Sequence, residues 1–333
     1  MATRTKTTIK RASQCNDFLL NDLFEKYIIE KNAHNISQAT EQSYRNSFNK
    51  FISFVGEEKT IDLVNDETVF AWINKMKSDG TKIISLNHYL REMRTFLYWC
   101  MNKELIKNDF KIKLLSFQEE TIKTYSEEEQ NAILEKPHKD ADFVEWRTYT
   151  VIGFVLDCGA RASTICNIKM QDVNLQTGYI TFSHTKNKKA QRVPMSSALI
   201  DAIHFYICEW RNNALPDDYL FCNVGELKLT PAALRLAFGK YCMKRGVVRI
   251  NKRGELEGKS NIHGLRHTFA KGYLLNNGNT FKLQQLLGHA TLDMTRKYVS
   301  LFGEDIKDGH DDFSPFSMSK KANGLKKTIK RAV

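Results

Sequence analysis

The stretch NIHGLRHTFAKGYLLNNGNTFKLQQLLGHATLDMTRKYVSL, residues 261–301, is the most informative part of the chain. Within fewer than forty positions it holds five side chains that can bind phosphate or carry protons: His263, Arg266, His267, His289 and Tyr298. A single histidine of this kind is usually a core or capping residue. The concentration of all five in one stretch indicates a reaction site.

Helix-end signals predict how this stretch folds. A leucine-rich helix should end at Gly288, because glycine suits the left-handed backbone that follows many helices. His289 then lies on a turn. Thr291 or Asp293 can cap a further helix that carries Tyr298. The sequence therefore predicts that the turn with His289 is followed directly by the helix that carries Tyr298.

A metal site is one alternative for the same residues. His263 and His267 have the spacing of zinc ligands on a metalloprotease helix, and His289 could be a third ligand. Gly264, however, stands where such a site has its glutamate base, and Arg266 would place a fixed positive charge beside the cation. No acidic cluster is evident to hold Mg²⁺. We expect neither a metal nor another cofactor.

Two segments, HGLRHTFA (263–270) and LLGHATLDMTRKY (286–298), resemble the active-site motifs of the tyrosine recombinase (phage integrase) family. In that family a His-x-x-Arg pair, a second His after Leu-Gly, and a Tyr nine positions later belong to one site. Here Arg266 and His289 are 23 positions apart, and His289 and Tyr298 are nine apart. Both spacings are consistent with the family.

Two upstream segments extend the resemblance, which spans about 125–301. DCGARASTICNIKMQDVNL (157–175) is similar to the motif with the first catalytic arginine, which falls on Arg161. HTKNKKAQRVPM (184–195) is similar to the hairpin with the catalytic lysine, which falls on Lys186. The motifs occur in the family's order.

The resemblance implies that Tyr298 attacks a DNA phosphodiester and forms a 3′-phosphotyrosine with a free 5′-hydroxyl. Two guanidinium groups, those of Arg161 and Arg266, suit the nonbridging oxygens because they stay charged and can donate two parallel hydrogen bonds. The covalent link conserves the energy of the phosphodiester, so rejoining needs no ATP.

The resemblance also implies how protons move. His263 is expected to accept the tyrosine proton, and His289 to donate to a phosphate oxygen. Lys186 is expected to protonate the leaving 5′ oxygen as a general acid. Lys188 and Lys189 are alternative candidates for the general acid, and any of the three lysines could instead only contact phosphate.

Three positions need separate interpretation. Thr164 stands where the family commonly has an acidic residue, three positions after Arg161, which leaves open how that arginine is oriented. His267 is interpreted as structural, packing beneath Arg266, and is left out of the catalytic set. Tyr273 is a second phenol nearby, but it does not follow the histidine motif.

The rest of the chain predicts a mainly α fold with a small β-sheet or hairpin. Apolar residues at helical spacing predict four helices before residue 107, forming a bundle whose aromatic residues lie in its core. Ser126 and Glu129 form a capping box, and Thr230-Pro231 begins another helix. Residues 178–184 and 190–195 predict a hairpin around TKNKK.

These patterns predict a helical-bundle core-binding domain, a linker and an α+β catalytic domain of the tyrosine recombinase type. The expected divisions are a basic segment 1–15, the core-binding domain 16–110, the linker 111–124, the catalytic domain 125–305 and a basic tail 306–333. We expect residues 1–15 not to form the separate arm-binding domain of larger phage integrases, because the segment is too short. The tail could dock on a neighbouring subunit or fold back on its own domain.

Composition agrees with a DNA partner. The 333 residues carry a formal net charge of +12, which favours a polyanion because bound cations release the counterions of phosphate. No apolar run is long enough to span a bilayer, so we expect no membrane association. The seven cysteines are scattered without a CxxC pair, which indicates reduced thiols in a cytoplasmic protein. Because its expected partner is DNA, we expect it to be nucleoid-associated.

The sequence therefore predicts a site-specific recombinase or integrase that acts on double-stranded DNA as a homotetramer on two sites. Strand exchange would pass through a four-way junction. We expect it to serve integration and excision of a mobile element rather than a housekeeping role, with an accessory directionality protein as a candidate partner. Two alternatives stay open. One is a DNA-relaxing enzyme like type IB topoisomerases, and the other is a catalytically inactive DNA-binding relative.

Overall fold

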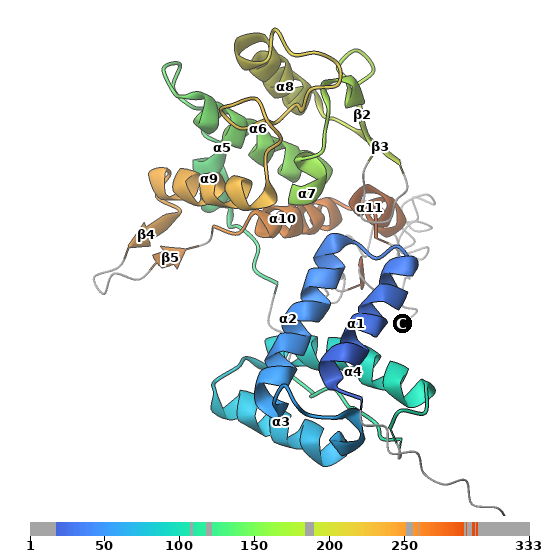
Figure 1. Cartoon of the computed structure of the whole chain (residues 1–333). Helices are drawn as coiled ribbons and strands as arrows, with labels where there is room; N and C mark the ends of the chain where they lie inside the picture. Colours follow the sequence, from blue (N-terminus) through green and yellow to red (C-terminus); the bar gives the residue numbers. More distant parts are fainter. Residues whose placement is uncertain are drawn as a thin grey trace, which may run out of the picture. The chain divides into compact units, whose positions relative to one another are not determined.

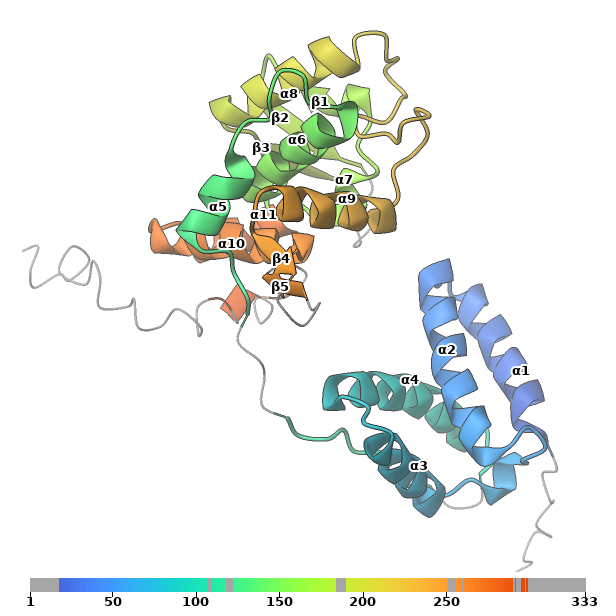
Figure 2. The ribbon, with the colours of Figure 1, turned by 90° about the vertical axis from the view of Figure 1, so that its left-hand side faces the viewer.

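The computed structural model describes residues 18–106, 109–117, 122–183, 190–250, 256–258, 260–289, 291, 295–296 and 298. The chain divides into two compact units, Met1–Glu119 and Glu120–Val333 (Figure 1, Figure 2). Helices dominate the described residues of both units, as the sequence predicts. No helix in this described part is long and apolar enough to cross a membrane.

Unit 1 contains the four helices that the sequence predicts. Their bounds are α1 Leu20–Ala33, α2 Gln38–Val55, α3 Asp66–Ser78 and α4 Ile83–Asn102, with a short 3-10 helix at Ile61–Leu63. Side-chain caps begin two of them: Ser37 accepts from the backbone N–H of Thr40, and Asn65 forms a reciprocal capping box with Thr68. Both α2 and α4 pack against the other helices of the bundle.

Aromatic rings fill the core of unit 1, which confirms their interpretation as core residues. Phe24 of α1 stacks on Phe48 of α2 with ring centroids 3.9 Å apart, and Phe96 of α4 meets both rings edge-on. The interpretation is wrong for Phe18, Phe54 and Phe70, which are exposed. Phe18 lies outside the bundle helices, because α1 begins only at Leu20.

The segment after α4 packs onto unit 1. The Asn87 side chain donates to the carbonyl oxygen of Leu115 and accepts from its N–H, both at 2.8 Å. The N–H of Ile112 donates to the Tyr98 hydroxyl at 3.1 Å, and Ile112 is buried. The first residues of the predicted linker 111–124 are thus attached to the bundle. The full extent of that linker stays a prediction.

Unit 2 is arranged around one buried helix, α6 Phe143–Cys158. The other helices are α5 Glu127–Leu134, α7 Ala162–Ile165, α8 Ser197–Trp210, α9 Pro231–Lys244, α10 Ile262–Leu275 and α11 Thr280–Leu287, with a 3-10 helix at Met170–Asp172. Helices α5, α8, α9 and α10 all pack against α6 (Figure 2). None of its residues is exposed, as expected of a helix that is covered on all sides.

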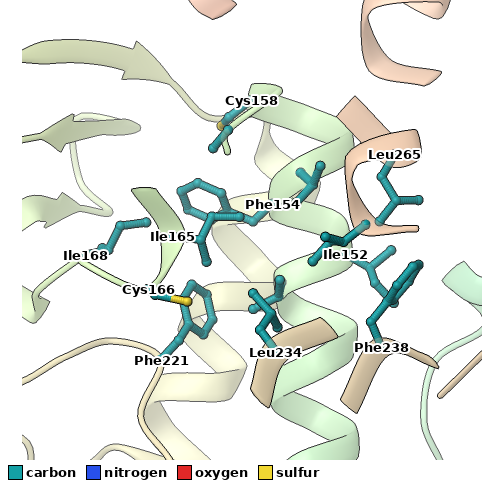
Figure 3. Packing of buried hydrophobic residues seen from close by; sticks show 14 of the residues in the cluster. Ile152, Phe154, Cys158, Ile165, Cys166, Ile168, Phe221, Leu234, Phe238 and Leu265 are labelled. Atoms are coloured by element: carbon teal, nitrogen blue, oxygen red, sulfur yellow. The ribbon is translucent and has the colours of Figure 1, made fainter. Parts of the chain in front are cut away.

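The predicted helix starts of unit 2 are confirmed. Ser126 and Glu129 form the capping box of α5, and Thr230 caps α9 with Pro231 in its first turn. Figure 3 shows the resulting core, in which side chains from α6, α9 and α10 meet. All of the following are fully buried: Ile152 and Phe154 of α6, Leu234 and Phe238 of α9, and Leu265 of α10.

The predicted hairpin is confirmed as part of a three-stranded antiparallel sheet, ordered β1 Val173–Asn174, β2 Tyr179–Phe182, β3 Gln191–Pro194. Ile180 pairs with Val193, and both are buried. β1 was not predicted, because two residues carry no periodic signal. A second hairpin, β4 Val248–Ile250 with β5 Leu256–Gly258, was also missed.

Candidate active site

The loop from α6 to α7 places Arg161. Gly159 ends α6 with φ at 62°, the left-handed region that glycine adopts without strain. A side chain there would also collide with its surroundings, since a Cβ atom would lie 2.5 Å from Cδ1 of Phe269. Two residues later Arg161 is the N-cap residue of α7 and is half-buried. Burial lowers the pKa of its guanidinium.

Arg266 connects α10 to the C-terminal ends of two other helices, α6 and α11. It lies on α10, is only 2% exposed, and donates from Nη1 to the carbonyl oxygen of Gly159 at 2.5 Å. Its Nη2 donates to the carbonyl oxygen of Leu287, near the end of α11, at 2.8 Å. Burial and the charge of Arg161 lower the pKa of Arg266 to about 10. It therefore remains charged at neutral pH.

The turn after α11 places His289 against Arg266. Gly288 ends the helix in the left-handed region, as predicted, with φ at 59°. The His289 N–H donates to the carbonyl oxygen of Gln284, and Nη2 of Arg266 lies 2.9 Å from Nε2 of His289. A guanidinium can only donate, so Nε2 must accept.

This contact fixes the protonation of His289. With Nε2 accepting, the ring proton is on Nδ1, which lies 2.9 Å from Oγ1 of the buried Thr295. Burial, followed by the charges of Arg266 and Arg161, lowers the pKa of His289 to about 4. His289 is therefore neutral at pH 7, and both of its ring nitrogens have hydrogen-bond partners. That leaves no free nitrogen for a metal ion.

Tyr298 lies among these groups and is 4% exposed. Its ring is parallel to that of His289, with centroids 6.3 Å apart, and it packs against Leu283 and Leu287 of α11. Its hydroxyl oxygen, Oη, is 2.8 Å from Nδ1 of His267. Burial raises the pKa of Tyr298, while the positive charges of Arg266 and Arg161 oppose that rise.

His263 and His267 are one turn apart on α10. Their rings meet edge to face with centroids 4.5 Å apart. His267 is half-buried, and burial together with the charges of His263 and Arg266 lowers its pKa to about 4. His263 is the more exposed of the two, and partial desolvation and the nearby arginines lower its pKa as well.

A cavity of about 590 Å³ opens beside this cluster, and Arg161, Arg266 and His289 all line it. Thr164, which is buried one turn after Arg161, lines it too. Lys186 falls in 184–189, outside the described residues. Gln191, two residues beyond that segment, lines the cavity and donates from Nε2 to two carbonyl oxygens at the end of α11, those of Gln285 and Leu286.

The structure thus brings Arg161, Arg266, His289 and Tyr298 together from positions spread over more than 130 residues. His263 contacts the ring of His267, which in turn contacts Tyr298. The contact between His267 and Tyr298 was not predicted from the sequence, from which His267 was expected to pack beneath Arg266. The spacing could have placed His267 in the site, since His263 and His267 are four residues apart and therefore lie on the same face of a helix.

Comparison with known proteins places this geometry in a family. Residues 123–304, more than half of the chain, match the Phage integrase family. Residues 21–104 match the Phage integrase, N-terminal SAM-like domain. The chain belongs to the phage integrase family. The two matches fall one on each structural unit, so the family assignment covers both the bundle and the unit that carries Tyr298.

Relatives of this integrase-family chain are tyrosine recombinases. One from Pseudothermotoga lettingae is 29% identical over 48% of this chain and 51% of its own length. The tyrosine recombinase XerD of Staphylococcus haemolyticus is 23% identical over 89% of this chain and 99% of its own length. The integrase of transposon Tn1549, solved with transposon right end DNA, shares the fold with a TM-score of 0.71, at 19% identity over 84% of this chain and 94% of that chain.

Proposed function

We propose that this chain cuts and rejoins DNA at specific sites with Tyr298 as nucleophile. The proposed catalytic set is Arg161, Lys186, His263, Arg266, His289 and Tyr298. One observation carries the proposal. The Tyr298 ring lies parallel to His289, whose Nε2 accepts from Arg266, beside a cavity that Arg161 lines. Two guanidinium groups and an imidazole thus line one opening, with the phenol packed against the imidazole, and phosphodiester cleavage by tyrosine requires these groups close together.

The two arginines supply positive charge where the reaction develops negative charge. The attacked phosphate carries a charge of about −1, and its nonbridging oxygens become more negative in the transition state. Fixed donors in a water-poor site stabilise that charge, and losing one typically costs about 3–4 kcal/mol of transition-state stabilisation. Arg266 is already held by the carbonyls of Gly159 and Leu287, so it needs little reorganisation.

The proposed step balances without a metal or nucleotide. The Tyr298 oxygen gives up its proton to a histidine of α10 and forms a bond to phosphorus, as the bond from phosphorus to the 5′ oxygen breaks. Lys186 gives that oxygen a proton, and the reverse reaction restores the phosphodiester. His289 has a specific requirement. Because its Nε2 accepts from Arg266, it can donate to a phosphate oxygen only after that hydrogen bond is exchanged.

The relatives support a recombinase rather than a protein that only binds DNA. We propose double-stranded DNA as substrate and a homotetramer on two sites, with strand exchange through a four-way junction. The fold shared with an integrase of a transposon supports a role in moving a mobile element. An accessory directionality protein and a cytoplasmic, nucleoid-associated location belong to the same proposal.

The test is covalent capture on a nicked suicide duplex taken from DNA that flanks the gene. The wild type and Tyr273→Phe, a matched phenol on α10, should form a protein–DNA adduct. Tyr298→Phe should bind the duplex and form none. Adducts with Tyr298→Phe would overturn the proposal. Relaxation of plasmids that lack the site, by a monomer, would indicate the topoisomerase alternative instead.

A further inference from the structure

The hydrogen bond between His267 and Tyr298 leads to an inference that the catalytic set above does not contain. Nδ1 of His267 lies 2.8 Å from Oη of Tyr298, a hydrogen-bond distance from the atom that must lose a proton. His263 contacts the His267 ring rather than the tyrosine hydroxyl. We propose that His267 holds the Tyr298 hydroxyl and takes its proton when the tyrosine attacks phosphorus. The inference rests on the proposed function.

The other groups around Tyr298 cannot take that proton as they stand. Arg266 and Arg161 are cations that only donate, and they favour the phenolate by their charge. His289 faces the tyrosine ring rather than its hydroxyl, and its two nitrogens are engaged by Arg266 and Thr295. Among the described residues, His267 is therefore the basic nitrogen placed to accept.

The environment keeps His267 in the accepting form. A pKa of about 4 means that the ring is neutral at pH 7, so Nδ1 has a free lone pair when the neighbouring N–H is on Nε2. An incoming phosphate brings negative charge, which offsets the nearby guanidinium charges and makes His267 more basic as the proton must move. The ring contact with His263 restricts the rotation of His267.

The proton balance closes in both directions. In cleavage, His267 Nδ1 gains the phenolic proton while Tyr298 Oη bonds phosphorus, and the leaving 5′ oxygen takes its proton from the general acid assigned to Lys186. In rejoining, the 5′-hydroxyl loses its proton to that lysine. The released tyrosine oxygen then recovers its proton from His267.

Two substitutions separate holding the hydroxyl from taking its proton. The Asn oxygen in His267→Asn lies close to the position of Nδ1, so it can accept the hydrogen bond but not a proton. His267→Ala does neither. Single-turnover cleavage of the suicide duplex should slow by about 100-fold or more in both variants, the range of a general base. His204→Asn on α8 is the control and should cleave like the wild type.

A duplex with sulfur in place of the leaving 5′ oxygen locates the defect. That leaving group needs no acid, so the sulfur duplex should restore cleavage by Lys186→Ala but not by either His267 variant. The cleavage rate of His267→Asn should also keep rising with pH, because solvent hydroxide must take the proton. Thermal unfolding of each variant shows whether it is folded, and His267→Asn serves if the alanine variant is not.

Each contrary outcome has a distinct meaning. Cleavage by His267→Asn at the wild-type rate would show that the hydrogen bond alone matters and would overturn proton transfer. Sulfur rescue of His267→Asn would also overturn it. Adducts formed by Tyr298→Phe would instead remove the proposed function on which the inference rests.

Discussion

At the scale of single residues, Tyr298 is one of twelve tyrosines, and its neighbours give it its chemistry. Burial alone would make it a weaker acid, and the charges of Arg161 and Arg266 act against that effect. Burial and the charge of Arg266 lower the pKa of both His267 and His289 and keep them neutral, and at His289 the charge of Arg161 adds to this. The site therefore combines fixed positive charge with imidazoles that can accept protons at pH 7.

The low histidine pKa values predict how stability depends on pH. His267 and His289 have ordinary values near 6.5 when unfolded and about 4 when folded, so between these limits the unfolded chain binds more protons. Stability should be complete above pH 6.5 and fall as the pH drops toward 4, by on the order of 2 kcal/mol after solvent screening. Thermal unfolding between pH 7 and 4.5 measures this. The loss should be smaller in His267→Asn, and an equal loss would show that other groups cause it.

Gly159 is expected to be the most sensitive glycine near the site. In Gly159→Ala the new methyl group meets Phe269 and Leu287 within 2.8 Å at a left-handed backbone. Strain and overpacking should destabilise the protein by about 2–4 kcal/mol. Gly239→Ala, in the interior of α9 with open space around it, should stabilise it by about 0.5–1 kcal/mol. Denaturant unfolding of the pair checks both signs, and equal effects would contradict the steric argument.

At the scale of elements, Gln191 joins the sheet to the end of α11. Its amide donates to the carbonyl oxygens of Gln285 and Leu286, where the last turn of a helix lacks its own donors. Gln191 opens β3, directly beyond the segment with Lys186, while α11 leads into the turn of His289. Gly288 permits the approach, because a Cβ there would lie 2.9 Å from Oε1 of Gln191. This contact connects the two parts of the proposed site.

Substitution of Gln191 should therefore affect cleavage as well as stability. Gln191→Ala should cost about 1 kcal/mol, and Gln191→Glu should cost more because a carboxylate would face two carbonyl oxygens. Both should slow single-turnover cleavage on the suicide duplex. Gln171→Ala removes an exposed amide that donates to Asp217 and is the matched control. It should change neither stability nor the cleavage rate. Unchanged cleavage by Gln191→Glu would show that the two parts are independent.

At the scale of the whole molecule, each unit has its own apolar core. Residues 1–119 should therefore fold without the rest of the chain into a helical bundle that unfolds cooperatively. Circular dichroism during thermal unfolding tests this. Asn87→Ala in the same fragment should lower its stability by about 1–3 kcal/mol, since it loses both hydrogen bonds to Leu115. A fragment without cooperative unfolding would show that the bundle depends on unit 2.

The cationic site predicts that DNA cleavage does not need a metal ion. Arg161 and Arg266 supply the charge that Mg²⁺ provides in other phosphoryl-transfer enzymes, and His289 has both nitrogens engaged. Adduct formation on the suicide duplex should therefore proceed at the same rate with an excess of EDTA. A rate that falls with EDTA and returns with added Mg²⁺ or Zn²⁺ would contradict the proposed mechanism.

Sequence signals of short range predicted the elements well. The capping box at Ser126, the Thr230-Pro231 start and the Gly288 end all depend on residues within one helical turn, so the chain itself specifies them. β1 and the β4–β5 hairpin were missed, since strands of two or three residues form only through pairing with a partner.

The sequence by itself determined the family motifs, their order and the helices that carry them, because these depend on residue identity and local spacing. Only the tertiary structure decided that Arg266 is held by backbone carbonyls and that His289 accepts from it. It also decided that His267, rather than His263, faces Tyr298. These contacts join residues between 21 and 107 positions apart, and a rotation of α10 about its axis would change the partner of each side chain. Packing around α6 fixes those rotations, so the chemistry of each histidine follows from the core.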